Sequence, residues 1–281
     1  MSRAIPNRQR ARASWLALAV AVASLTRCLA DDATSPRTTR LHVFAASSLL
    51  ESFRELEAAF EAREPHLDVV LTFAGSQVLR LQIGQGADAE VFASANPEHL
   101  DTLVAAGLMR PRGVFAHNEL VVITSPDDQR IRSLDDLTEA RRLVIGVRTV
   151  PVGRYTRALL DRASAARGAD LADRVLERVV SEESNVRLVR AKVELGEADA
   201  AIVYATDAAA SDRVRAVPIS EDVNVRADYV LGFAPDAGAA ADAFLAFVRS
   251  PAGQAILRQH GFAPAAAPPT EPEPKPPAEA R

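Results

Sequence analysis

The sequence predicts an α/β fold, because strand signals and helix signals alternate along the chain of 281 residues. Short apolar runs recur between residues 40 and 263, and most are followed by apolar residues three and four positions apart. The composition is that of a globular protein, with 48% hydrophobic and 25% charged residues, and the length suffices for two domains. We therefore expect a mainly parallel sheet with helices on both faces.

Strands and helices are expected in succession from residue 41 onward. A strand at residues 41–46 precedes a helix that begins at Ser48 and has one apolar face, formed by Leu49, Phe53, Leu56 and Phe60. A strand at 69–73 precedes a helix that begins at Ser76, and a further helix is expected at 97–106. The remaining strands are expected at residues 90–93, 120–123, 143–147, 179–180, 200–204 and 229–233. Ligands of such folds bind beyond the carboxyl ends of the strands, where helix N-termini point.

Residues 1–30 are predicted to be a signal peptide. They carry five arginines and no acidic residue, and the apolar run at residues 15–25 is too short to span a bilayer. Cleavage after Ala30 would release a soluble periplasmic protein, which we favour, whereas lipidation of Cys28 would anchor the protein to a membrane. Cys28 is the only cysteine, which excludes an intrachain disulfide and a cysteine metal cluster.

At the other end, residues 264–281 contain seven prolines and almost no large apolar side chain. Such a segment buries too little surface to offset the entropy of ordering, so we predict a disordered, proline-rich tail. Between the two ends the chain is acidic, since the formal net charge is −4 although the first thirty residues are basic. Such a surface lacks the clustered lysines and arginines that bind nucleic acid, so we expect no nucleic-acid partner.

The sequence offers no catalytic constellation. Its five histidines are scattered and form no HExxH metal motif. The glycines at positions 84 and 86 lack the third glycine of a dinucleotide-binding motif, and Ser48 lacks the flanking glycines of a nucleophile elbow. We therefore expect a protein that is not an enzyme and that needs no cofactor.

Four segments share a pattern that suits anion binding. In each, a strand ends, a small or kinked segment follows and a helix begins, at residues 46–48, 74–76, 150–153 and 184–186. The first N–H groups of a helix have no partner within it and lie at the positive end of its dipole. Taken singly, Ser48 and Ser76 are more often plain N-caps. Val152 and Val186 are explained as core valines, and Tyr204 as a half-buried tyrosine whose hydroxyl reaches a polar group. The residues alone therefore indicate an anion-binding α/β protein.

Six segments together resemble the molybdate-binding proteins of ABC importers. They are FAASSL, FAGSQ, EVFASA, VPVGRY, the long segment at residues 185–208, and SPAGQAILRQHGF at 250–262. They occur in the family's order and cover nearly all of residues 41–262, and the segment ending at Ala208 is the most specific. The resemblance implies the type II periplasmic-binding-protein fold, in which two crossover strands join two α/β lobes and the ligand lies in the cleft.

Carried over residue by residue, the resemblance implies five oxyanion contacts and no direct metal-ion ligand. Ser48 and Ser76 would donate from their hydroxyl and backbone N–H groups, and Val152 and Val186 from their backbone N–H groups. Tyr204 would donate from its phenol. The chain departs from the family at Gln77, in a motif that is usually rich in serine, and at Val152, where alanine is common.

The resemblance also implies the domain organisation and the function. Lobe one is expected at residues 40–118 and 224–262, and lobe two at 119–223. The protein is expected to be a periplasmic monomer that captures molybdate or tungstate for an ABC importer, with the permease and ATPase subunits as partners. A binding protein for another anion, such as sulfate or an organic carboxylate, is the alternative, which Arg154 and Arg187 keep open because they lie close to the motifs.

Overall fold

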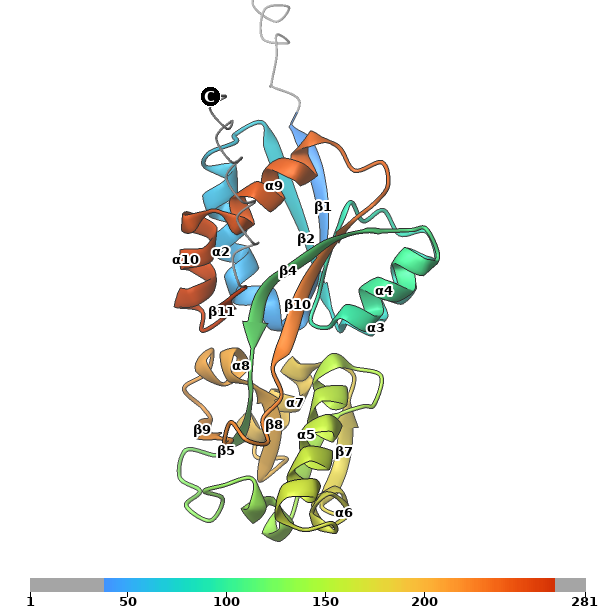
Figure 1. Cartoon of the computed structure of the whole chain (residues 1–281). Helices are drawn as coiled ribbons and strands as arrows, with labels where there is room; N and C mark the ends of the chain where they lie inside the picture. The colour runs from blue at the N-terminus through green and yellow to red at the C-terminus, as the bar shows by residue number, and fades with distance from the viewer. Residues whose placement is uncertain (1–37, 266–281) are drawn as a thin grey trace, which may run out of the picture. The chain divides into compact units, whose positions relative to one another are not determined.

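The computed structural model describes residues 38–265. The predicted signal peptide, Cys28 and all but the first two residues of the predicted tail therefore lie outside the described residues. Eleven strands form two sheets in the described part of the chain. The six-stranded sheet has the order β11-β4-β10-β3-β1-β2 and the five-stranded sheet the order β7-β6-β8-β5-β9. We call the six-stranded sheet and its helices lobe one, and the five-stranded sheet and its helices lobe two (Figure 1).

Lobe one takes its strands from both ends of the described chain. They are β1 (Thr39–Ala46), β2 (Leu67–Ala74), β3 (Val91–Ser94), β4 (Arg110–Asn118), β10 (Ala227–Phe233) and β11 (Ala263–Pro264). Its helical segments are the 3-10 turn η1 (Ser47–Leu49), α2 (Leu50–Glu61), α3 (Ser76–Gly84), α4 (Pro97–Ala105), α9 (Ala239–Arg249) and α10 (Pro251–Gln259).

Lobe two is formed by the part of the chain between β4 and β10, the two strands after and before which the chain crosses between the lobes. Its strands are β5 (Leu120–Thr124), β6 (Leu143–Gly146), β7 (Val179–Glu183), β8 (Ala200–Tyr204) and β9 (Arg215–Pro218). Its helical segments are η2 (Asp135–Glu139), α5 (Pro151–Arg167), α6 (Leu171–Leu176), α7 (Val186–Glu194) and α8 (Ala205–Ala209).

Both sheets are mixed, so the expectation of a mainly parallel sheet is wrong. β1 runs parallel to β2 and β3, whereas β10 runs antiparallel to β3 and β4. The reason is that the chain leaves lobe one along β4 and returns along β10, which inserts between β3 and β4 in the opposite direction (Figure 1). In lobe two, β6 is parallel to β7 and β8, and β5 is antiparallel to β8 and β9.

Three strands of the structure, β4, β9 and β11, were absent from the sequence prediction. β11 has only two residues, too few for a readable pattern. β4 carries Pro111 and a glycine, Gly113, with a φ of 83°, and its register against β10 shifts twice. Proline and glycine of this kind are typical of turns, which hides the strand in the sequence. β9 has four residues and ends in Pro218, so it lacks a readable alternation. The other expected strands are present.

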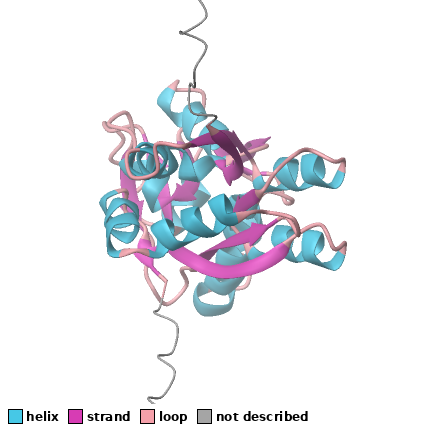
Figure 2. Cartoon of the chain, turned by 90° about the horizontal axis from the view of Figure 1, so that it is seen from above, coloured by secondary structure: helices cyan, strands magenta, loops and turns pink. Residues whose placement is uncertain are grey.

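The strand side chains alternate between two hydrophobic cores, which confirms helices on both faces of the first sheet (Figure 2). On β1, Val43 and Ala45 enter the main core, which also contains Phe53 of α2 and Phe244 of α9. Phe44, between them in sequence, enters a second core with side chains of α3 and α4. Helices α2 and α9 therefore cover one face of the six-stranded sheet, and α3 and α4 cover the other.

The two crossings between the lobes lie side by side. Asn118 at the end of β4 pairs with Ala227 of β10 in lobe one, and Leu120 pairs with Tyr204 in lobe two. Asn224 ties the crossings together, because its Nδ2 donates to the Leu120 carbonyl over 3.0 Å. Its Oδ1 accepts from the N–H of Val225 over 2.8 Å. The two crossing segments are therefore in direct contact with each other.

Among residues 38–265, no helix combines the length and the apolar character that a membrane-crossing helix requires.

The main core of lobe one should depend on Phe53, which is fully buried and makes edge contacts with Phe115 at 5.9 Å and Phe244 at 6.2 Å between ring centroids. Phe53→Ala should lower the free energy of unfolding by about 3–5 kcal/mol, measured by urea denaturation. Leu81→Ala, at a position 49% exposed on α3, is the control and should cost less than about 1 kcal/mol. Equal losses in the two variants would contradict this role of Phe53.

Candidate functional site

A small cavity of about 10 Å³ lies between the lobes, at the carboxyl ends of strands from both sheets. No charged side chain lines it. The lining residues of lobe one are Ala46, Ser47, Ser48, Gly75, Ser76 and Ala95. Those of lobe two are Val150, Pro151, Val152, Asn185, Val186 and Tyr204. The structure therefore brings all five sequence-predicted site residues to one place, although their contact with a ligand stays a prediction.

Three helices of at least nine residues begin at this cavity. α3 begins at Ser76 after β2, α5 begins at Pro151 after β6, and α7 begins at Val186 after β7. The first backbone N–H groups of each helix have no intrahelical partner, and they lie at the positive end of the helix dipole. N–H groups from both lobes are thus available around one small space, as an anion site requires.

The local sequence explains why the second-lobe helices begin where they do. Pro151 occupies the first turn of α5, where its missing N–H costs nothing and its fixed φ suits a helix. Asn185 caps α7, because its side-chain oxygen accepts from the N–H of Leu188 over 3.1 Å. That contact occupies the Asn185 oxygen at the site.

The two serines are not N-caps, so the simpler explanation from the sequence is wrong. The cap of α3 is Gly75, and Ser48 lies inside η1. The Ser76 Oγ accepts from the N–H of Ala95 over 3.1 Å, and the Ser48 Oγ lies 2.8 Å from the Tyr229 hydroxyl. Because the Ser76 oxygen already accepts a hydrogen bond from the protein, its own hydrogen is available to an acceptor in the cavity.

The Tyr204 hydroxyl is the least satisfied donor at the site. Tyr204 is 1% exposed, and its hydroxyl has no hydrogen-bond partner among residues 38–265. Burial raises the pKa of the Tyr204 phenol well above its usual value, so it stays neutral and can donate. A buried hydroxyl without a partner costs about 1–3 kcal/mol, which an acceptor in the cavity would recover.

Four polar contacts join the lobes around the cavity. The Gln77 Nε2 donates to the Ser184 carbonyl over 2.7 Å, and the His99 Nε2 lies 3.0 Å from the Thr149 carbonyl. Two ion pairs add to these contacts, Arg154–Glu98 at 2.9 Å and Arg187–Glu51 at 2.6 Å. No local pattern in the sequence predicts these contacts, because each joins residues at least 50 positions apart.

The same ion pairs decide the role of two arginines that the sequence left open. Arg154 and Arg187 each bind an acidic side chain of lobe one, and neither lines the cavity. They therefore join the lobes instead of presenting a cation to a ligand.

Gly75 makes a close approach of the lobes possible. A Cβ at this position would lie 2.6 Å from the Ser184 carbonyl oxygen of lobe two and 2.5 Å from the Gln77 Oε1. Backbone oxygen atoms cannot move aside as a flexible side chain can. The φ of Gly75 is −62°, so its backbone is ordinary and the missing Cβ is the feature that matters.

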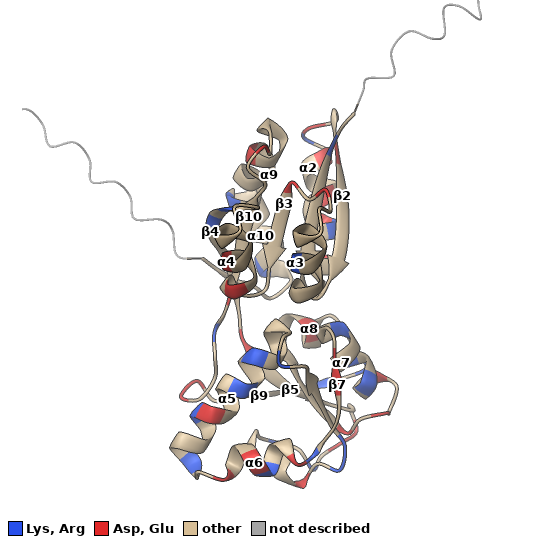
Figure 3. Cartoon of the chain, turned by 90° about the vertical axis from the view of Figure 1, so that its right-hand side faces the viewer, with Lys and Arg blue, Asp and Glu red and all other residues tan. Residues whose placement is uncertain are grey.

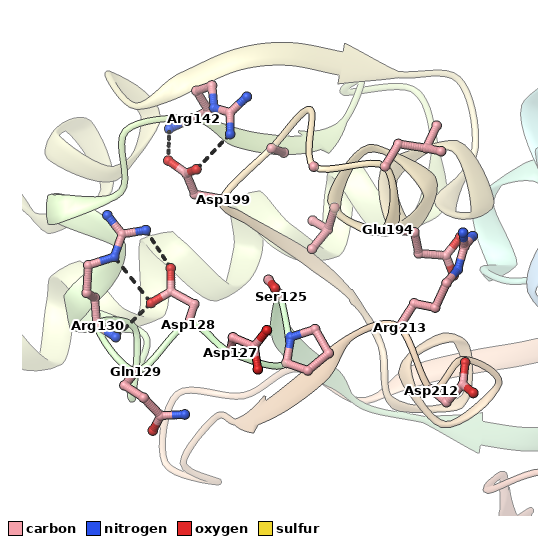
Figure 4. A pocket seen from close by; sticks show the side chains of 15 residues that line it. Ser125, Asp127, Asp128, Gln129, Arg130, Arg142, Glu194, Asp199, Asp212 and Arg213 are labelled. Carbon is pink, nitrogen blue, oxygen red and sulfur yellow. Dashed lines mark hydrogen bonds and ion pairs between the residues drawn. The ribbon is translucent and has the colours of Figure 1, made fainter.

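A larger cavity of about 900 Å³ lies within lobe two, lined by residues of the β5–η2 loop, α7 and the β8 and β9 loops (Figure 4). Its arginines are neutralised by neighbouring acids. Arg130 pairs with Asp128, Arg142 with Asp199 and Arg213 with Glu194, at 2.5, 2.9 and 2.8 Å. Charged side chains of both signs also occur along surface helices such as α5 (Figure 3). Every arginine that lines this larger cavity is therefore paired with an acid.

Comparison with known proteins identifies the family of the chain. The family model described as "Bacterial extracellular solute-binding protein" matches residues 41–263. The molybdate-binding protein ModA of Mycobacterium tuberculosis is 36% identical over 260 residues, which cover 88% of this chain and 96% of that protein.

Solved structures show the fold. The periplasmic molybdate-binding protein of Azotobacter vinelandii has a TM-score of 0.65 at 22% identity, covering 79% of this chain and 98% of that one. The sulfate-binding protein SubI of Mycobacterium tuberculosis has a TM-score of 0.72 at 17% identity, covering 81% and 88%. The predicted two-lobed α/β fold of the type II periplasmic binding proteins is confirmed.

His99 should make stability depend on pH. Burial lowers the pKa of its imidazole below the usual 6.5, and the cations Arg80 and Arg154 act in the same direction, whereas the Thr149 carbonyl and Glu98 oppose it. The unfolded chain therefore binds a proton near pH 6.5 that the folded chain does not. The stabilisation is present above pH 6.5 and is lost as the pH falls toward the folded-state value.

The measurement is urea unfolding at pH 7.5 and 5.5 for the wild type and His99→Gln, which keeps an N–H donor without a titrating ring. Between these two pH values the wild type should lose more stability than the variant, by at most about 1.4 kcal/mol per pH unit below 6.5. Identical losses would show that His99 does not titrate differently in the two states.

Proposed function

The chain belongs to the bacterial extracellular solute-binding proteins, and from that premise we propose that it captures molybdate or tungstate for an ABC importer. The observation that carries this proposal is the uncharged cavity that helix N-termini and hydroxyl groups of both lobes surround. In this proposal the protein acts in the periplasm as a monomer, delivers its ligand to the permease and ATPase subunits, and performs no catalysis.

The proposed ligand contacts all donate hydrogen bonds. They are the hydroxyls of Ser48, Ser76 and Tyr204 and the backbone N–H groups of Ser48, Ser76, Val152 and Val186. Such neutral dipoles stabilise a dianion strongly in a space that excludes water, because they are already oriented and little screened. The acidic surface does not prevent this, since exposed charges more than about 10 Å away are largely screened by salt.

A site that offers only hydrogen-bond donors should distinguish a fully deprotonated anion from one that carries a proton. Molybdate and tungstate are fully deprotonated near neutral pH, so each oxygen can accept. Phosphate retains at least one proton at that pH, and its O–H group needs an acceptor. No carboxylate lines the cavity, and the Asn185 oxygen already accepts one hydrogen bond from Leu188. The O–H group of phosphate would therefore find no carboxylate acceptor and would compete with the donors around it.

Size and charge bear on the alternatives. An organic carboxylate would need space for its carbon skeleton and, in the usual arrangement, an arginine. The two nearby arginines are paired across the lobes, and neither lines the cavity. Sulfate is the second candidate, because it is a fully deprotonated tetrahedral dianion and a sulfate-binding protein shares this fold. Its smaller radius should make simultaneous contact with both lobes weaker.

The export and domain assignments belong to the same proposal. We propose that residues 1–30 are a signal peptide cleaved after Ala30, in preference to lipidation at Cys28. Lobe one is assigned to residues 40–118 and 224–262 and lobe two to 119–223, with residues 264–281 as a tail.

The direct test is a series of melting temperatures with molybdate, tungstate, sulfate and phosphate at equal millimolar concentration and constant ionic strength. A ligand at about 100 times its dissociation constant adds roughly 2.7 kcal/mol to the folded state. We expect large shifts with molybdate and tungstate, a small shift with sulfate and none with phosphate. A phosphate shift equal to that of molybdate would show that an acceptor lines the cavity. A shift with an organic carboxylate alone would favour that ligand class.

Gly75 supplies a test of lobe closure. Gly75→Ala should weaken molybdate binding at least tenfold in calorimetric titration, because its Cβ would meet the Ser184 carbonyl. Gly84→Ala is the matched control, since it lies on the same helix and a Cβ there meets nothing within 4 Å. The control should bind like the wild type. If Gly75→Ala also did so, the lobes would not need to approach as closely as the structure shows.

A further inference from the structure

A buried hydrogen-bond chain leads from the crossing between the lobes to Ser48 at the cavity. Tyr229 of β10 is fully buried among aromatic rings, including those of Phe115, Tyr204 and Phe262. Its hydroxyl lies 2.8 Å from the Ser48 Oγ and accepts from the Asn118 Nδ2 over 3.5 Å. Tyr229 does not line the cavity, so it can affect a ligand only through Ser48.

Contacts at Asn118 determine which groups donate and which accept in this series of hydrogen bonds. The Asn118 Oδ1 accepts from the N–H of Glu119 over 2.9 Å, which fixes the orientation of the amide group. The Nδ2 therefore faces the other way, where it donates to the Thr206 Oγ1 over 2.8 Å and to the Tyr229 oxygen. Asn118 has no acceptor left for the Tyr229 hydrogen.

The Tyr229 hydrogen therefore goes to Ser48. The Ser48 Oγ lies 2.8 Å from the Tyr229 hydroxyl, an ordinary distance for an accepted O–H···O hydrogen bond. The reverse polarity, with Ser48 donating, would leave the buried Tyr229 hydrogen unsatisfied, which is costly. Burial also raises the pKa of the Tyr229 phenol, so the hydrogen is retained at neutral pH.

We propose that Tyr229 is a positioning residue that holds the Ser48 hydroxyl as a donor toward the bound oxyanion. This inference rests on the proposed function. With one lone pair of Ser48 engaged by Tyr229, the Ser48 hydrogen is directed away from Tyr229 and is available to the ligand. Asn118 and Tyr229, which do not line the cavity, would then help to keep Ser48 a hydrogen-bond donor, as a fully deprotonated anion requires.

Removal of the tyrosine hydroxyl should change both affinity and selectivity. In Tyr229→Phe, Ser48 can rotate, and it can accept from a protonated ligand as well as donate. We expect molybdate binding to weaken about five- to tenfold in calorimetric titration. Phosphate binding should weaken less or strengthen, so the ratio of the phosphate to the molybdate dissociation constant should fall. A purely structural loss would weaken both anions alike and leave that ratio unchanged.

A double-mutant cycle identifies the path. If Tyr229 acts through Ser48, Tyr229→Phe should cost molybdate affinity in the wild type but almost nothing in Ser48→Ala. Tyr155→Phe is the matched control, because its hydroxyl accepts from the Asp228 N–H over 3.3 Å and does not contact Ser48. The effect of Tyr155→Phe, whatever its size, should be the same in both backgrounds.

A second variant covers the case in which Tyr229→Phe does not fold. Asn118→Asp keeps the acceptor for Glu119 but offers Tyr229 an acceptor in place of a donor, so the Tyr229 hydrogen would turn away from Ser48. Asn118→Asp should therefore lower molybdate affinity less in the Ser48→Ala background than in the wild type. Equal costs in both backgrounds, for whichever variant folds, would overturn the positioning role. If the wild type bound neither molybdate nor tungstate, the proposed function itself would be wrong and this inference would fall with it.

Discussion

Three helix N-termini from two lobes meet at one water-sized cavity, and the rest of the structure is arranged around that meeting. An isolated helix end offers only partial charge, roughly half an elementary charge, and it acts within about one turn. α3 belongs to lobe one, whereas α5 and α7 belong to lobe two. The convergence therefore needs both lobes, since neither lobe alone brings the three helix starts together.

Formal charge is kept outside the cavity and used to hold the lobes. The arginines beside the site are engaged in the pairs Arg154–Glu98 and Arg187–Glu51. These pairs are partly exposed, so each contributes little to stability by itself. Their placement nevertheless leaves neutral donors alone with the proposed dianion. A cation within the cavity would bind many anions, whereas a set of oriented donors distinguishes an oxygen that can accept from one that carries a proton.

The crossing between the lobes takes part in the site as well as joining the sheets. β10 inserts between β3 and β4, which places the Tyr229 hydroxyl 2.8 Å from the Ser48 Oγ and 3.5 Å from the Asn118 Nδ2, which donates to it. Asn118 also contacts Thr206 of lobe two. The residues at the crossing are thus in contact with both lobes. Through Tyr229 they also contact Ser48, the proposed ligand donor.

The sequence by itself determined the α/β class, most strands and the positions of the helix starts, because these depend on local periodicity and on residues such as Pro151 that act within one turn. It also indicated Ser48, Ser76, Val152, Val186 and Tyr204, through the resemblance of six segments to the molybdate-binding proteins of ABC importers. Only the tertiary structure decided that these residues line one cavity, that both sheets are mixed, and that Arg154 and Arg187 bind acids across the lobes. The physical reason is sequence separation. The partners of Ser48, Asn118 and Gln77 lie 181, 111 and 107 residues away at Tyr229, Tyr229 and Ser184, and no local pattern encodes a contact that exists only after two sheets have folded and met.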